Sequence, residues 1–116
     1  MATRTNLWRY REGLTDTSGL VGYDVEATDG SIGKIDKASN ETSRAYVVVD
    51  TGFWIFGKKR MIPAGVVNRV DHDDGKVYVS MTKDEIKSAP DFDEQRTNWT
   101  DADYQTSERY YDRYGW

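Results

Sequence analysis

Residues 22–35 read GYDVEATDGSIGKI and contain two stretches of alternating apolar and polar side chains that meet at Asp29-Gly30. Such alternation places one face of a β-strand in the core and the other in water. Asp29-Gly30 tolerates the positive φ angles of a primed two-residue turn, so we expect a β-hairpin here. Gly33 lies inside the second strand, where a glycine usually marks a bulge or a bend at a barrel corner.

Short strand patterns continue after this hairpin. Residues 45–49 are apolar at every position, as in a central strand that is covered on both faces. Pro63 cannot donate to a ladder, which places it at a sheet edge or a strand end. Asp74-Gly75 predicts a second hairpin. About six short strands in all predict a mainly β protein, a small β-barrel or compact sandwich. The further strand segments are residues 53–56, 60–62, 66–70 and 76–80.

A short helix is predicted directly after the last strand. Thr82 and Glu85 have the spacing of a capping box, in which each side chain bonds the backbone N–H of the other residue. Pro90 then ends the helix after about two turns, because proline disfavours a helical conformation in the residue before it.

The C-terminal tail, residues 91–116, has few aliphatic side chains and many aromatic ones. Thr100 begins a capping pattern for a helix over residues 101–114, which would carry Tyr104 and Tyr111 on one stripe. A disordered acidic tail is the alternative.

We expect three parts along the chain. They are an N-terminal arm, a barrel domain and an acidic aromatic tail, with the bounds 1–19, 20–90 and 91–116.

The net charge of −4 lies entirely in the tail, because residues 1–90 hold thirteen acidic and thirteen basic side chains, whereas residues 91–116 hold seven and three. A balanced body with an acidic end lacks the clustered cations that neutralise phosphates. We therefore expect no binding to nucleic acid.

The sequence offers no set of catalytic, metal-binding or cofactor-binding residues, and we expect a protein that is not an enzyme. Cysteine is absent, which removes disulfides and thiolate sites and fits a reducing compartment. His72 is the only histidine and lies in a polar turn without a nucleophile elbow. No apolar stretch is long enough to span a membrane, and the first residues lack the core of a signal peptide, so we expect a cytoplasmic protein.

Residues 53–56, Phe-Trp-Ile-Phe, carry large apolar side chains on both faces of the predicted strand. A small barrel cannot bury both faces of a peripheral strand, so one aromatic pair needs cover from the chain's own arm and tail, a second copy, another protein or a membrane. The three cations that follow are interpreted as a solvated turn. The candidate interface residues are Phe53, Trp54, Phe56, Lys58, Lys59, Arg60, Tyr111 and Trp116.

The order of these features resembles the PRC-barrel family, named after the cytoplasmic domain of the photosynthetic reaction centre H subunit and shared with the C-terminal domain of a ribosome maturation factor. The resemblance covers residues 20–90. It implies a small β-barrel that acts in protein interaction and self-association rather than in a reaction. The matching residues are Gly22, Val25, Asp29 to Gly30, Ile32 to Ile35, Val47 to Asp50, Met61 to Pro63, Val66, Val77 to Ser80, and Thr82 to Ala89.

Three functions remain open from the sequence. The first is a non-enzymatic interaction module, a homodimer that docks an unidentified protein partner. The second is a ligand binder or enzyme with a site in the barrel mouth. The third is an RNA- or ribosome-associated module that uses exposed aromatic side chains and the cations of residues 58–60.

Overall fold

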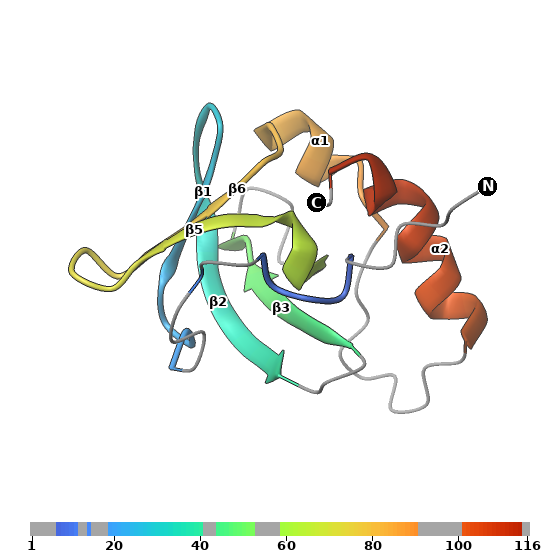
Figure 1. Ribbon diagram of the computed structural model, residues 1–116. Helices are drawn as coiled ribbons and strands as arrows, with labels where there is room; N and C mark the ends of the chain where they lie inside the picture. The colour runs from blue at the N-terminus through green and yellow to red at the C-terminus, as the bar shows by residue number, and fades with distance from the viewer. Residues whose placement is uncertain are drawn as a thin grey trace.

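Six strands form one sheet in the order β4-β3-β2-β1-β6-β5 (Figure 1). All neighbouring strands are antiparallel except β1 and β6, which are parallel. The mainly β class with about six short strands is confirmed. The strands are β1 (Asp24–Ala27), β2 (Gly30–Asn40), β3 (Ala45–Asp50), β4 (Lys59–Pro63), β5 (Val67–Asp71) and β6 (Lys76–Val79). The computed structural model describes residues 7–11, 14, 19–40, 44–52, 59–90 and 101–114.

The sheet curls around its own core without closing into a complete barrel (Figure 1). Its two end strands, β4 and β5, follow each other in the chain through the 3-10 turn η2 (Ala64–Val66). Among the described residues no hydrogen-bonded ladder joins β4 to β5. Pro63 ends β4 at one edge of the sheet, as expected for a residue that cannot donate to a ladder.

The first hairpin is confirmed, but its turn lies one residue earlier than predicted. Ala27 pairs with Gly30, so the two loop residues are Thr28 and Asp29. Gly30 begins β2 with φ +144°, a conformation that L side chains rarely adopt. The side chain of Asp29 accepts a hydrogen bond from the backbone N–H of Lys83 at 2.8 Å, which ties the hairpin tip to the helix that follows the sheet.

Gly33 occupies an irregular position in β2, as predicted. Its φ is +149°, and the pairing register of β1 with β2 shifts between Val25 and Glu26, opposite this point. A second shift in β2 leaves Asp36 without a directly paired residue in β3. These irregularities bend the long strand β2, which pairs with β1 along its first half and with β3 along its second half.

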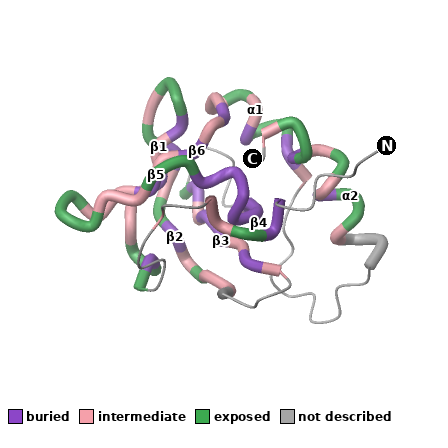
Figure 2. Tube along the Cα trace, viewed as in Figure 1, coloured by how far each residue is buried: buried purple, intermediate pink, exposed green. Residues whose placement is uncertain are grey.

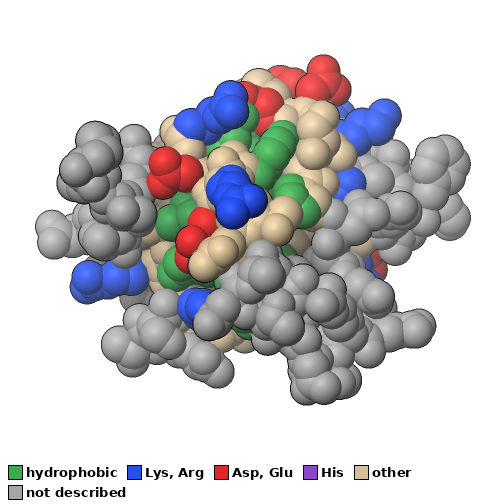
Figure 3. Space-filling model, turned by 90° about the vertical axis from the view of Figure 1, so that its right-hand side faces the viewer, with side chains coloured by type: hydrophobic (Ala, Val, Ile, Leu, Met, Phe, Trp, Pro, Cys, Tyr) green, Lys and Arg blue, Asp and Glu red, His purple; other side chains and the backbone are tan. Residues whose placement is uncertain are grey.

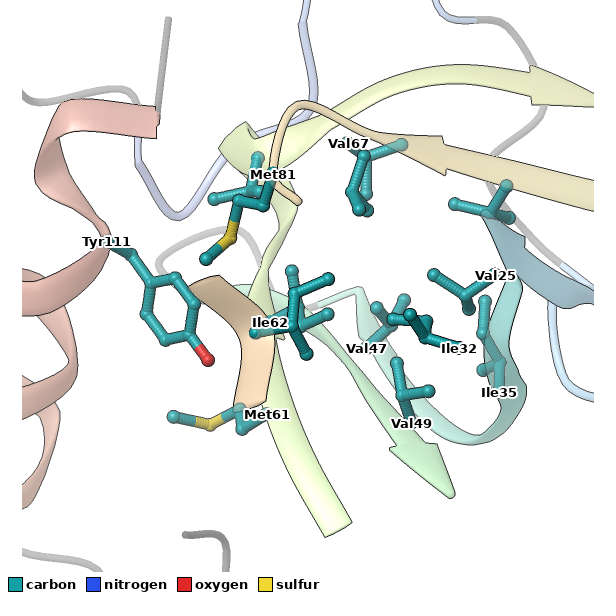
Figure 4. Close-up of a cluster of buried hydrophobic side chains, with 14 of the residues drawn as sticks. Val25, Ile32, Ile35, Val47, Val49, Met61, Ile62, Val67, Met81 and Tyr111 are labelled. Carbon is teal, nitrogen blue, oxygen red and sulfur yellow. The ribbon is translucent and has the colours of Figure 1, made fainter. Parts of the chain in front are cut away.

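The interior of the curled sheet is filled with aliphatic side chains (Figure 4). Side chains that alternate between the two faces of the strands produce this core, because every second residue of β1 and β6 is buried. The hairpin tips and the outer positions stay exposed or half-buried (Figure 2). Buried side chains inside the sheet include Val25, Ile32, Ile35, Val47, Val49, Ile62, Val67 and Val77.

The capped helix is confirmed as α1 (Lys83–Lys87). The Thr82 hydroxyl accepts from the backbone N–H of Glu85 at 3.2 Å, and the Glu85 carboxylate accepts from the backbone N–H of Thr82 at 2.8 Å. This reciprocal pair satisfies two of the N–H groups that a helix start leaves free.

The tail helix is also confirmed, as α2 (Asp101–Tyr111) followed by the 3-10 turn η3 (Asp112–Tyr114). Its proposed cap, Thr100, lies outside the described residues. The disordered tail is therefore wrong for residues 101–114, because Tyr111 is fully buried in the main core. Burial of this aromatic ring supplies the apolar contact that the acidic composition alone does not predict.

The N-terminal arm contributes to the same core. Leu7 and Trp8 are buried, and their backbone carbonyls accept hydrogen bonds from Gly65 at 2.7 Å and Ala45 at 2.9 Å, respectively. The arm therefore links η2 to the start of β3. That residues 20–90 fold independently of the tail remains a prediction.

Candidate functional site

The predicted aromatic interface lies in the connection between β3 and β4. Asp50 and Lys59 are a directly opposed pair at the end of these two strands. The candidate residues Phe53, Trp54, Phe56 and Lys58, and the strand predicted for residues 53–56, lie outside the described residues, as does Trp116.

The base of this connection is held by polar contacts. The Lys59 ammonium donates to the Asp36 carboxylate at 2.8 Å, and the Asp50 carboxylate accepts from the backbone N–H of Gly52 at 2.9 Å. Thr51 is buried. Asp36 lies at the irregular point of β2, and Lys59 lies in β4 on the other side of β3. The ion pair therefore spans β3 and involves the residue at the bend of β2. Both ends of the aromatic connection are therefore fixed by β3 and β4.

Acidic and basic residues alternate across the whole sheet at the level of this base. Each residue is directly opposed to the next on the neighbouring strand. Opposite charges at such positions stabilise strand pairing by about 0.2–1 kcal/mol each, so the row also favours the observed register. We call it the charge band. It runs Asp71, Lys76, Asp24, Lys34, Asp50, Lys59, one residue from each of β5, β6, β1, β2, β3 and β4.

Arg60 was expected in a solvated turn, and that interpretation is wrong. The residue lies in β4 and is only 3% exposed. Its guanidinium donates to the carbonyl oxygens of Ile86 at 3.1 Å and Lys87 at 2.9 Å. These carbonyls end α1, where a helix leaves acceptors without an internal partner, and the planar fork of an arginine can serve two of them together. Arg60 thus fixes α1 against β4.

A layer of aromatic side chains joins the arm, β3 and α2. The Trp8 indole N–H donates to the Glu108 carboxylate at 2.8 Å, and its ring meets Tyr46 and Tyr104 edge-on, with centroids 6.5 and 5.7 Å away. The Arg44 guanidinium lies over the Tyr104 ring, 3.8 Å from its centroid. On the α2 side of the molecule, hydrophobic side chains lie between charged ones (Figure 3). The sequence did not identify the partner of Trp8, because that partner is a hundred residues away.

The end of the tail is fixed to α1 through Glu85. The Tyr114 hydroxyl donates to the Glu85 carboxylate at 2.8 Å, and the Tyr110 hydroxyl donates to the Glu85 backbone carbonyl. The Ser80 hydroxyl donates to the backbone carbonyl of Tyr114 at 3.0 Å. Burial and the Glu85 carboxylate raise the pKa of Tyr114 to about 12. Tyr114 therefore stays a donor throughout the physiological range.

The pKa of Glu85 is lowered, whereas the pKa of Tyr114 is raised. Hydrogen bonds from the Thr82 backbone and the Tyr114 hydroxyl lower the pKa of the Glu85 carboxyl below its usual value of 4.5. A group with a lowered pKa stabilises the folded state above its unfolded pKa, and this contribution is lost as pH falls through the folded pKa.

We expect acid to weaken the attachment of the tail to α1. Below about pH 4.5, the usual value of this carboxyl, protonation of Glu85 should lower the thermal midpoint of the wild type more than that of Glu85→Gln, which has no carboxylate to protonate at this position. Thermal melts of both proteins over about pH 3 to 7 would measure the difference, since the two proteins share every other carboxylate. Parallel curves for the two proteins would contradict this role.

His72 lies in the exposed turn between β5 and β6, as predicted. Its Nδ1 atom is 2.7 Å from the Tyr23 hydroxyl, and the two rings meet edge-on. In the part of the chain that the structure describes, no three acidic or histidine side chains gather in a group that could hold a metal ion. No helix among the described segments is long and apolar enough to cross a membrane.

Comparisons with known proteins give a partial likeness to solved structures. A scan against protein-family models found no match, and neither did a search of curated proteins. Among solved structures, the chain is similar to a Pseudomonas aeruginosa crystal structure assigned as a 16S ribosomal RNA processing protein, RimM, with 21% sequence identity and a TM-score of 0.46. The match covers 56% of this chain and spans 42% of that one. It is a partial likeness in chain path and carries no assignment of function.

Proposed function

We propose that this chain is a non-enzymatic protein-interaction module that associates with a second copy of itself through a surface centred on residues 53–56. The observation that carries the proposal is the anchored base of this aromatic connection. Asp50 and Lys59 pair at its root, and the ion pair from Lys59 to Asp36 braces the same point. Fixed ends reduce the conformational entropy that a connecting segment loses when it binds a partner.

The aromatic side chains of the arm and the tail support the same proposal, because the described ones already have partners within the chain. Trp8 packs between Tyr46 and Tyr104, and Tyr114 bonds to Glu85. These residues were candidate covers for the aromatic connection. Their engagement elsewhere favours an external partner for residues 53–56.

The composition of the core favours an interaction module over a ligand binder. Aliphatic side chains such as Val25, Val47 and Ile62 fill the middle of the curled sheet, where a barrel-mouth ligand would lie (Figure 4). The PRC-barrel resemblance of residues 20–90 also implies protein interaction rather than a reaction. A cytoplasmic location is proposed because the sequence contains no cysteine, which fits a reducing compartment.

The RNA-associated alternative gains no support from the described cations. Arg60 is buried and bonded to the end of α1, and Lys59 is paired with Asp36. A phosphate contact would need these groups to be accessible at the surface. Two of the three cations in the predicted patch, Lys59 and Arg60, are therefore engaged in contacts within the chain.

The interface proposal predicts that Trp54→Ser/Phe56→Ser converts a dimer into a folded monomer. Aromatic anchors at the centre of an interface each contribute about 2 kcal/mol or more, so their joint loss should abolish association at micromolar concentrations. Light scattering would measure the mass, and circular dichroism would verify the fold. Val21→Ser is a matched control, because it removes an apolar side chain that is 60% exposed on another segment. An unchanged mass for the double variant would refute the aromatic interface.

A further inference from the structure

The four central residues of the charge band have a symmetry that the fold does not require. They are Lys76, Asp24, Lys34 and Asp50, on the adjacent strands β6, β1, β2 and β3. Their side chains lie on the outer face of the sheet, because the neighbouring residues Val25, Val49 and Val77 are buried inside it. Adjacent strands are about 4.8 Å apart, so these four charges form a short and closely spaced row.

The centre of the row is accessible to solvent. Lys34 and Asp24 form an ion pair of 2.8 Å, although their side chains are 66% and 40% exposed. An ion pair as exposed as this contributes little to the stability of a monomer. Four alternating charges in register therefore suggest a use beyond the stability of the single chain.

The row is complementary to itself when it is reversed. A two-fold axis between Asp24 and Lys34 places Asp24 of each copy opposite Lys34 of the other. The same axis places Lys76 of each copy opposite Asp50 of the other. Every acid then meets a base at all four positions, which is the condition for an isologous contact between identical subunits.

We propose that the charge band is a contact surface for a second copy of this chain, arranged about this two-fold axis. The inference rests on the proposed self-association and names a surface for it outside residues 53–56. The row carries two acids and two bases, so a uniformly acidic or basic partner would gain attraction at two positions and repulsion at the other two. A reversed copy gains attraction at all four.

The position of the row next to the aromatic connection supports the same arrangement. Asp50, at one end of the four-residue row, pairs with Lys59 at the root of the aromatic connection. A copy that docks on the row would therefore also lie close to this root. Charged residues around an apolar centre are the usual composition of an interface rim, where they determine register and partner choice.

A charge exchange between two variants tests the proposal. In Lys34→Glu the two-fold axis brings Asp24 of one copy against the new glutamate of the other, and in Asp24→Lys it brings two lysines together. Each contact occurs twice in a dimer, so each variant alone should dimerise at least about tenfold more weakly than the wild type. An equimolar mixture should restore the dimer, because an acid then faces a base at both central positions.

The mixture separates an interface effect from a folding effect. Each variant keeps its like-charged neighbours within the chain after mixing, so recovery of the dimer cannot come from repair of the fold. Lys87→Glu and Asp84→Lys, which make the same charge changes at exposed positions of α1, are the matched controls and should dimerise like the wild type. Analytical ultracentrifugation of the wild type should also show dissociation as salt rises to 1 M, where the screening length falls to about 3 Å.

The outcomes distinguish this inference from the proposed function. A wild type that is monomeric throughout, or a mixture as monomeric as its components, overturns the charge-band contact. If the charge variants remain dimeric while Trp54→Ser/Phe56→Ser becomes monomeric, the aromatic interface stands and this surface is rejected. Restoration by mixing while the aromatic variant still dimerises supports this surface and rejects the aromatic one.

Discussion

A Gly33→Ala variant is expected to lose a large part of its folding stability. A Cβ atom at this position would lie 2.1 Å from the carbonyl oxygen of Asp50 and 3.1 Å from the Cα atom of Thr51. These are backbone atoms of the last residue of β3 and of the residue after it, so no side-chain rotation can relieve the collision. β2 and β3 would have to separate at the point where Asp50 begins the aromatic connection.

The loss should be about 4 kcal/mol or more, against a total stability of about 5–15 kcal/mol for a domain of this kind. Gly75→Ala is the matched control, because Gly75 also has a positive φ, +64°, but has no atom within 4 Å of the added Cβ. That variant should lose only about 1–2 kcal/mol from backbone strain. Urea unfolding would compare the two, and equal losses would contradict the collision.

The sequence predicted Gly33 as a special position because it interrupts an alternating pattern. It did not predict which backbone approaches it, since Asp50 is seventeen residues later and belongs to another strand. The turn before it was misplaced by one residue for a related reason. Asp29-Gly30 is a strong local hairpin signal, but the bond from Lys83 to Asp29 fixes the turn from outside the hairpin.

The local sequence pattern gave a wrong prediction of solvent exposure for Arg60. Three consecutive cations ordinarily indicate a solvated segment, and nothing near them in the sequence suggests otherwise. The Ile86 carbonyl oxygen that accepts a hydrogen bond from the buried Arg60 lies near the end of a helix, twenty-six residues later in the chain. The capping box of that helix could be predicted because Thr82 and Glu85 are close in the sequence. Arg60, which bonds the C-terminal end of the helix, could not be predicted as its partner.

The charge band has the same dependence on long-range register. Asp24, Lys34 and Asp50 occur in three separate segments, and their alignment requires the register shifts of β2 on both of its sides. A slip of one residue would move each side chain to the opposite face of the sheet. Strand identities could therefore be predicted from the sequence, but the row of charges could be recognised only from the pairing.

Tyr111 gives the second large expected effect, and two substitutions separate its ring from its hydroxyl. The ring is fully buried and lies near Met61 and Met81 (Figure 4). Tyr111→Ala should therefore cost about 3–5 kcal/mol, because it leaves a cavity between α2 and the sheet. This loss would also show that the tail contributes to the stability of the sheet.

Tyr111→Phe should have the opposite sign. The Tyr111 hydroxyl is buried and has no hydrogen-bond partner among the residues that the structure describes. Burial raises the pKa of this group above its usual value, partly offset by the charge of Arg60. A buried hydroxyl that lacks a partner costs about 1–3 kcal/mol, so its removal should raise the free energy of unfolding by about 1 kcal/mol. Tyr114→Phe is the matched control and should be destabilising, because its hydroxyl donates to Glu85. Urea unfolding of the three variants would decide, since a loss of stability in Tyr111→Phe would show that this hydroxyl has a partner in solution.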